Sequence, residues 1–148
     1  MRSLTLPLAL LLVFAAASSA DDPAAVVKYR QSTMKSLGAH MAAMSLVVKK
    51  KVTNRTQLAA HAEAIRALAG GIPALFPPGT DPAHVPTSAL PAVWQKSGEF
   101  AAAARTLEQE SAKLAAAAKD ARAFDAQFEH VGAACNGCHK QFRKRDAE

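Results

Sequence analysis

FDAQFEHVGAACNGCHKQF, residues 124–142, is the stretch that decides the fold of this 148-residue chain. Apolar side chains and two cysteines recur in it at alternating gaps of four and three residues, at Phe124, Phe128, Val131, Cys135, Cys138 and Phe142. Such gaps place side chains on one face of an α-helix. The stretch is therefore predicted to be a helix that turns both cysteines toward the same interior as the phenylalanines.

Within that helix, Cys135-Asn136-Gly137-Cys138-His139 has the Cys-x-x-Cys-His pattern of haem c attachment. Two thiols three positions apart lie on one side of a helical turn, where they can add to the two vinyl groups of a haem. The adjacent imidazole can then ligate the iron, and a glycine between the cysteines leaves room for the ring near the backbone. The pattern predicts one covalently attached haem c.

Other uses of a cysteine pair fit less well. A thioredoxin-like redox pair would follow a strand in a βαβ unit, whereas the surrounding sequence has helical periodicity. A structural zinc site needs four ligands, and the chain has no second cysteine pair, since it contains only 2 cysteines. An ordinary short disulfide remains as the alternative.

Residues 1–20 are predicted to be a secretory signal peptide. Arg2 provides a short basic region, residues 4–17 are apolar but too few to span a bilayer, and small residues precede a cleavage point after Ala20. A retained N-terminal anchor is the alternative. Cleavage would leave one domain, residues 21–148. We expect a periplasmic protein, because bacteria attach haem c outside the cytoplasm.

The formal net charge is +6, and basic residues gather at 49–51 and 140–145. A basic surface can bind nucleic acid, but in an exported haem protein it is better suited to attract acidic partner proteins or to solvate helix ends. Lysines 49–51 suit the C-terminal end of a helix. We expect residues 140–145 to dock an acidic redox partner, and we expect no nucleic-acid ligand.

Three further segments have helical periodicity. The first, from about residue 22 to 52, has a stripe at Val27, Arg30, Met34, Leu37, Met41, Met44 and Val48. The second runs from about 54, with Asn54 as predicted cap and Gln57 reaching back to it, to Gly70. The third runs from about 91 to 118, and the cysteine-bearing helix from about 120 to 144.

Residues 72–91 are rich in proline and break the pattern. They are predicted to form a long crossover connection, with a turn near residues 74–76. A loop of this length inside a compact domain needs a function, and covering one edge of a cofactor would be one. Four helices, one long loop and an internal cofactor predict an all-α, antiparallel four-helix bundle with haem c inside it.

Three pieces of the chain occur in an order typical of one family. They are Tyr29-Arg30-Gln31 with Met34 and Lys35-Ser36-Leu37-Gly38, then Leu75-Phe76-Pro77 with Gly79-Thr80 and Val93-Trp94, and finally the haem motif with Phe142-Arg143. On these residues the mature chain resembles the cytochrome c′ family, the class II cytochromes c with their low-spin relatives. Most other small cytochromes c carry the haem motif near the N-terminus, so its C-terminal position is the most specific feature.

The resemblance implies the roles of individual side chains. They are thioether bonds from Cys135 and Cys138, proximal iron ligation by His139, propionate contacts from Arg30 and Gln31, a distal position for Met34, distal crowding by Phe76, and a basic neighbour of His139 in Arg143. Arg30 has independent support, because a charge on an apolar stripe needs a partner and a carboxylate would pair with it. The alternative is an arginine that extends from the helix start to water.

Met34 separates two functions. If its sulfur binds the iron, methionine/histidine ligation suits electron transfer. If it only packs over the iron, the haem is five-coordinate, and the resemblance then implies that nitric oxide or another small gas can bind. We expect His40, His61, His84 and His130 to be surface or hydrogen-bonded residues rather than iron ligands.

An enzyme is not expected, because no acid–base constellation accompanies the haem motif. The resemblance further implies that homodimers can form through the first two helices. No membrane span is expected in the mature protein.

Overall fold

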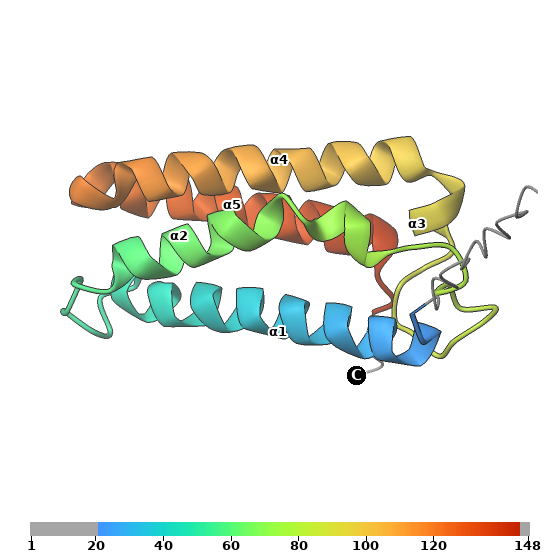
Figure 1. Cartoon of the computed structure of the whole chain (residues 1–148). Helices are drawn as coiled ribbons and strands as arrows, with labels where there is room; N and C mark the ends of the chain where they lie inside the picture. The colour runs from blue at the N-terminus through green and yellow to red at the C-terminus, as the bar shows by residue number, and fades with distance from the viewer. Residues whose placement is uncertain (1–20, 146–148) are drawn as a thin grey trace, which may run out of the picture.

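The computed structural model describes residues 21–145, which form a bundle of four long helices with short helical turns between them (Figure 1). The long helices are α1 (Pro23–Val48), α2 (Leu58–Ala69), α4 (Ser97–Ala116) and α5 (Ala121–Phe142). The short elements are η1 (Ile72–Leu75), α3 (Ala92–Gln95) and η2 (Ala117–Lys119). Each long helix runs antiparallel to the next, so the predicted all-α four-helix bundle is confirmed.

Capping aspartates begin the first and last long helices. The Asp22 side chain accepts a hydrogen bond from the Ala24 amide at 3.1 Å, and Pro23 occupies the first turn of α1. The Asp120 side chain accepts from the amides of Arg122 and Ala123 at 2.9 and 3.0 Å. These bonds satisfy amides that have no partner within the helix.

The end of α1 lies a few residues before the predicted one. Lys50 has a φ of 58°, in the left-handed region that ends many helices. The amides of Lys51 and Val52 then donate to the carbonyl of Leu46 at 2.8 and 3.1 Å. This reversal directs the chain toward α2.

The predicted start of α2 at Asn54 is wrong, because α2 begins at Leu58. The Asn54 side chain accepts hydrogen bonds from the amide and the hydroxyl of Thr56, at 2.9 and 2.8 Å. Such a local turn competes with helix formation. Gln57, which we expected to reach back, precedes the helix without a side-chain capping bond.

The third helix is interrupted, although its sequence predicts a continuous one. Lys96, with φ −122° and ψ 46°, separates α3 from α4. In α3, the indole of Trp94 donates to the carbonyls of Phe76 and Pro77 at 3.1 and 3.2 Å. These bonds tie the short helix to the long loop instead of to the axis of α4.

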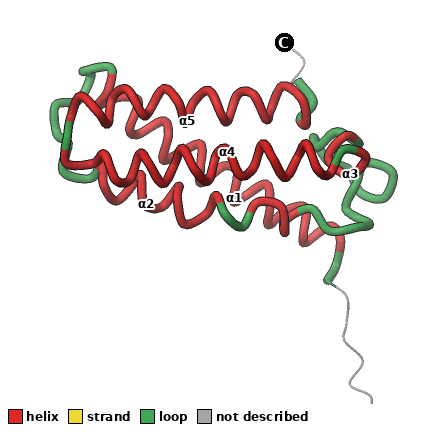
Figure 2. Tube along the Cα trace, turned by 90° about the horizontal axis from the view of Figure 1, so that it is seen from above, coloured by secondary structure: helices red, strands yellow, loops and turns green. Residues whose placement is uncertain are grey.

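The loop of residues 72–91 stays at one end of the bundle and joins the antiparallel neighbours α2 and α4 (Figure 2). The predicted crossover is therefore wrong, because the loop does not cross the bundle. It is paired with the end of α5. The Leu90 amide donates to the Phe142 carbonyl at 2.9 Å, and the Lys144 amide donates to the Ser88 carbonyl at 2.8 Å. The start of α1, the loop and the end of α5 therefore share one end of the molecule.

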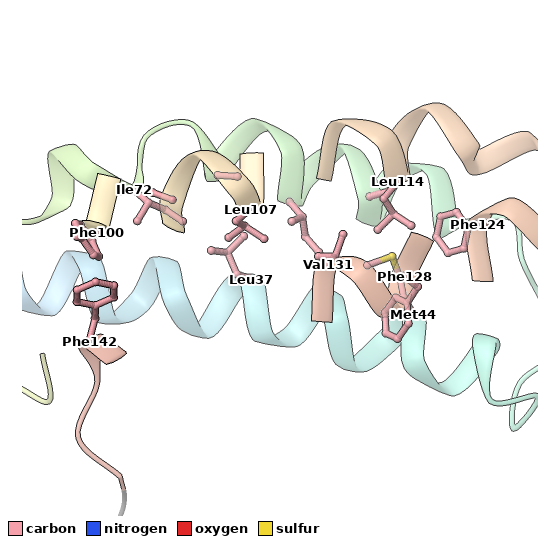
Figure 3. Close-up of a cluster of buried hydrophobic side chains, with 14 of the residues drawn as sticks. Leu37, Met44, Ile72, Phe100, Leu107, Leu114, Phe124, Phe128, Val131 and Phe142 are labelled. Atoms are coloured by element: carbon pink, nitrogen blue, oxygen red, sulfur yellow. The ribbon is translucent and has the colours of Figure 1, made fainter. Parts of the chain in front are cut away.

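Apolar side chains from all four long helices fill the interior (Figure 3). Fully buried members include Met44, Ile65, Leu114, Phe124 and Val131. Burial of one such side chain contributes about 1.5–3 kcal/mol. Phe100 and Phe142 lie at the opposite end of the core from Leu114 and Phe124.

No helix within residues 21–145 is both long and apolar enough to cross a bilayer. The predicted signal peptide, residues 1–20, lies outside the described part of the chain.

Candidate haem site

Both cysteines of the motif lie on α5 and pack against the core, as the helical periodicity predicted. Cys135 and Cys138 are half-buried and carry free thiols. Burial raises the pKa of both thiols, and the neighbouring Cys135 raises that of Cys138 further. The pair therefore presents two sulfurs along one side of α5, one helical turn apart, as two thioether bonds require.

A groove of about 620 Å³ runs between α4 and α5 beside Cys138. Its walls combine the polar side chains of Glu99, Glu110, His130 and Gln141 with small residues such as Ala102, Ala133 and Gly137. A Cβ atom added at Gly137 would meet nothing within 4 Å. The surface beside the second cysteine, between α4 and α5, is thus open to water.

His139 follows on the last turn of α5 and is exposed. Partial burial lowers the pKa of its imidazole, and the positive charge of Arg143 lowers it further. The amide of Arg143 donates to the carbonyl of His139 at 3.1 Å, and Arg143 forms an antiparallel bridge with Ala89 of the loop. The predicted neighbours His139 and Arg143 therefore lie together at the helix end.

Arg30 on α1 is buried, with 3% of its surface exposed. The alternative that this side chain extends into water is therefore wrong. Its Nη1 donates to the hydroxyl of Thr80 at 3.0 Å and to the carbonyl of Leu75 at 3.3 Å. Its Nη2 donates to the carbonyl of Thr80 and to the hydroxyl of Thr87, both at 2.9 Å. The guanidinium thus holds the long loop onto α1.

Every one of these four acceptors is neutral, and burial lowers the pKa of Arg30. The ion pairs within residues 21–145 do not include Arg30. A buried cation is costly without a nearby negative charge. The surroundings of Arg30 therefore fit a ligand that brings a carboxylate, as a haem does.

Aromatic rings continue the contact from Arg30 to the end of α5. The guanidinium carbon lies 4.6 Å from the centre of the Phe76 ring and 5.6 Å from that of Trp94. Phe76 meets Phe100 edge-to-face at 4.8 Å, and Phe100 meets Phe142 at 5.2 Å. Through these rings the loop contacts the helix that bears the haem motif.

The two other predicted haem contacts on α1, Met34 and Gln31, differ in how deeply they are buried. Met34 is half-buried and packs against the core, as does Met41 further along α1. Gln31 is exposed, and the structure does not bring it into the buried cluster around Arg30.

The hydrogen bonds that Arg30 donates to the Thr87 hydroxyl and to the carbonyls of Leu75 and Thr80 were not predicted from the sequence. Threonines in a proline-rich loop were the only available signal.

A four-helix bundle whose last helix bears a Cys-x-x-Cys-His motif defines a class of haem c proteins. The family model described as Cytochrome C' matches residues 25–143. The chain belongs to the cytochrome c′ family, and its cofactor is haem c. Cys135 and Cys138 fit the Cys-x-x-Cys-His pattern of its attachment.

Individual relatives support this assignment. Cytochrome c′ of Pararhodospirillum photometricum is 38% identical over 83% of this chain and 99% of its own length. Cytochrome c-554 of Cereibacter sphaeroides is 30% identical over 97% of both chains. A nitric oxide complex of a mutant cytochrome c prime from Alcaligenes xylosoxidans superposes with a TM-score of 0.77 at 31% identity, covering 86% of this chain and 100% of that one.

Proposed function

We propose that this protein is a periplasmic electron carrier, exported with cleavage of residues 1–20, that moves single electrons through one haem c. The observation that supports it is the end of α5, where the exposed His139 lies beside the exposed basic residues Lys140, Arg143 and Lys144. A haem ligand close to a basic surface provides a docking face for an acidic redox partner. The protein is a carrier and not an enzyme under this proposal.

The proposed haem contacts come from three parts of the fold. Cys135 and Cys138 hold the ring by thioether bonds, and His139 is the proximal ligand. Arg30 would pair with a propionate, because it is a buried cation with neutral partners only, and the exposed Gln31 would contact a propionate from the surface. Phe76 and Met34 would line the distal side of a ring held inside the bundle, and Arg143 adjoins His139. When bound, haem supplies an iron that exchanges one electron.

Met34 is the proposed second axial ligand. Thioether ligation raises the reduction potential of a haem and suits electron transfer. Met34 lies one helical turn after Arg30 on the same stripe of α1, and its side chain packs against the core. A residue that contacts the distal side would have this position.

The absorption spectrum of the ferrous protein tests this ligation. A sharp, split low-spin band is expected for the wild type and its loss for Met34→Ala. Met41→Ala is the matched control, because Met41 is also half-buried on the same stripe. A broad high-spin band in the wild type would contradict ligation by Met34.

A second candidate function is the binding of nitric oxide at a five-coordinate haem. The nitric oxide complex of the relative from Alcaligenes xylosoxidans supports it. Rapid uptake of nitric oxide by a high-spin ferrous wild type would favour this function over electron transfer. In that case Met34 packs over the iron without binding it.

A further inference from the structure

Two histidines meet between α1 and α2, outside the haem motif. The Nδ1 atoms of His40 and His61 are 2.9 Å apart, and their rings are tilted by 57° with centroids 5.2 Å apart. Both side chains are half-buried. The two helices run side by side and antiparallel (Figure 1), so each contributes one imidazole to the same point of contact.

The separation of these nitrogens suits a shared metal ion. Metal–imidazole bonds of about 2.0–2.1 Å at a right angle place two nitrogens about 2.9 Å apart, whereas a tetrahedral angle places them about 3.3 Å apart. Right-angled nitrogen ligands are typical of tetragonal Cu²⁺. Cu²⁺ also binds a given nitrogen site more tightly than the other divalent ions of the first transition row.

The surroundings leave room for the other ligands of such an ion. A groove of about 280 Å³ adjoins the pair and is lined by His61, Asn54 and Gln57 together with apolar side chains. Water can reach His61 through this groove. In the described part of the chain, no cluster of three or more histidine, cysteine or acidic side chains suits a metal ion, so an ion at this pair would have two imidazoles and no third side chain of these types.

The local charge also permits a cation. The positions three and four residues away from His40 on α1 are Ser36, Leu37, Ala43 and Met44. The corresponding positions around His61 on α2 are Gln57, Leu58, Ala64 and Ile65. None of these side chains is basic, so no positive charge lies one turn from either imidazole to repel a metal ion.

We propose that His40 and His61 form a binding site for one Cu²⁺ ion, with the two Nδ1 atoms as adjacent ligands and water at the remaining positions. The site is separate from the haem, whose motif lies on α5. A bound ion joins α1 to α2 and stabilises the native state, since the unfolded chain does not hold the two imidazoles together.

Copper titration of the ferric holoprotein tests the site. Electron paramagnetic resonance of the wild type with one equivalent of Cu²⁺ should give an axial signal split by two nitrogens. His40→Gln and His61→Gln should each weaken Cu²⁺ binding by at least about tenfold, because the second ligand is no longer held in place. His84→Gln and His130→Gln are matched controls that should bind as the wild type does.

A second measurement keeps the test independent of how well the variants fold. Cu²⁺ should raise the melting temperature of the wild type and of both controls, and at the same concentration should raise that of His61→Gln by clearly less. A wild-type copper signal without two-nitrogen splitting would overturn the proposal. Equal Cu²⁺ affinity in the wild type and His61→Gln would do so as well, and the pair would then be an N–H···N hydrogen bond only.

Discussion

Arg30 on α1 and Thr80 in the long loop are joined by two hydrogen bonds at one end of the bundle. Nη1 donates to the threonine hydroxyl at 3.0 Å, and Nη2 donates to the threonine carbonyl at 2.9 Å. Nη2 also donates to the hydroxyl of Thr87, which in turn accepts from the amide of Ala89 at 3.2 Å. Ala89 bridges to Arg143. One buried cation thus connects α1, through the loop, to the end of the helix that bears His139.

Replacing Arg30 should loosen this connection. Arg30→Met leaves two carbonyls and two hydroxyls of the loop without their donor, which should lower the free energy of unfolding by about 3 kcal/mol. Urea unfolding of the ferric holoprotein measures the loss. Amide hydrogen exchange should quicken within residues 75–90, because the loop opens before the rest of the bundle.

Two further variants delimit the role of Arg30. Arg30→Lys keeps the charge but cannot form four bonds in one plane, so its loss should be intermediate. Arg105→Met, at an exposed position of α4, should change stability by less than about 0.5 kcal/mol. Unchanged loop exchange in Arg30→Met would show that the loop is held by its other contacts.

The core predicts a clear contrast between two leucines. Leu114 on α4 is fully buried, whereas Leu46 on α1 is 51% exposed. Leu114→Ala should destabilise the bundle by about 2–5 kcal/mol through lost burial and a residual cavity. Leu46→Ala should cost less than about 1 kcal/mol, because much of its side chain already contacts water. Urea unfolding of both variants checks the difference, and similar losses would contradict the packing at Leu114.

The sequence predicted the parts of this fold that depend on local periodicity. The stripe of α5 and the position of both cysteines follow from gaps of three and four residues, and the prolines of residues 72–91 locate the loop. The start of α2 was missed because the Asn54 side chain accepts from the amide and hydroxyl of Thr56 in a local turn, and the helix begins only at Leu58. The break at Lys96 was missed because it depends on Trp94 reaching the loop carbonyls.

The site was predictable only where its chemistry lies within one short segment. The haem motif lies within five consecutive residues, 135–139, so its spacing alone predicts haem c attachment. The partners of Arg30 are 45, 50 and 57 residues away in sequence, and His61 is 21 residues from His40. Contacts between such distant residues form only when the helices pack, so no local sequence pattern predicts them.

The basic surface near His139 should control reactions with anions. Lys140→Glu/Lys144→Glu should slow the oxidation of the ferrous protein by ferricyanide at low ionic strength, because the local potential becomes less positive. Stopped-flow absorbance measures the rate, and the difference should shrink as salt is added. Lys49→Glu/Lys51→Glu changes the same net charge at the opposite end of the bundle and should leave the rate nearly unchanged. Equal slowing by both pairs would indicate a net-charge effect and no docking face.

The ionised carboxylate of Glu110 should stabilise the native state at neutral pH and should lose this effect in acid. Its pKa is lowered below the usual 4.5 by hydrogen bonds from Lys113 and then from Gln127, the latter on α5. A carboxyl whose folded-state pKa is depressed stabilises the native state above its unfolded-state pKa, and this stabilisation is lost as pH falls through the folded-state value. Glu110→Gln should therefore be less stable than the wild type at pH 6, and the difference should narrow below about pH 4.5. Urea unfolding across this range measures it, with the exposed Glu129→Gln as control. A difference that stays constant with pH would assign the effect of Glu110 to packing rather than to its charge.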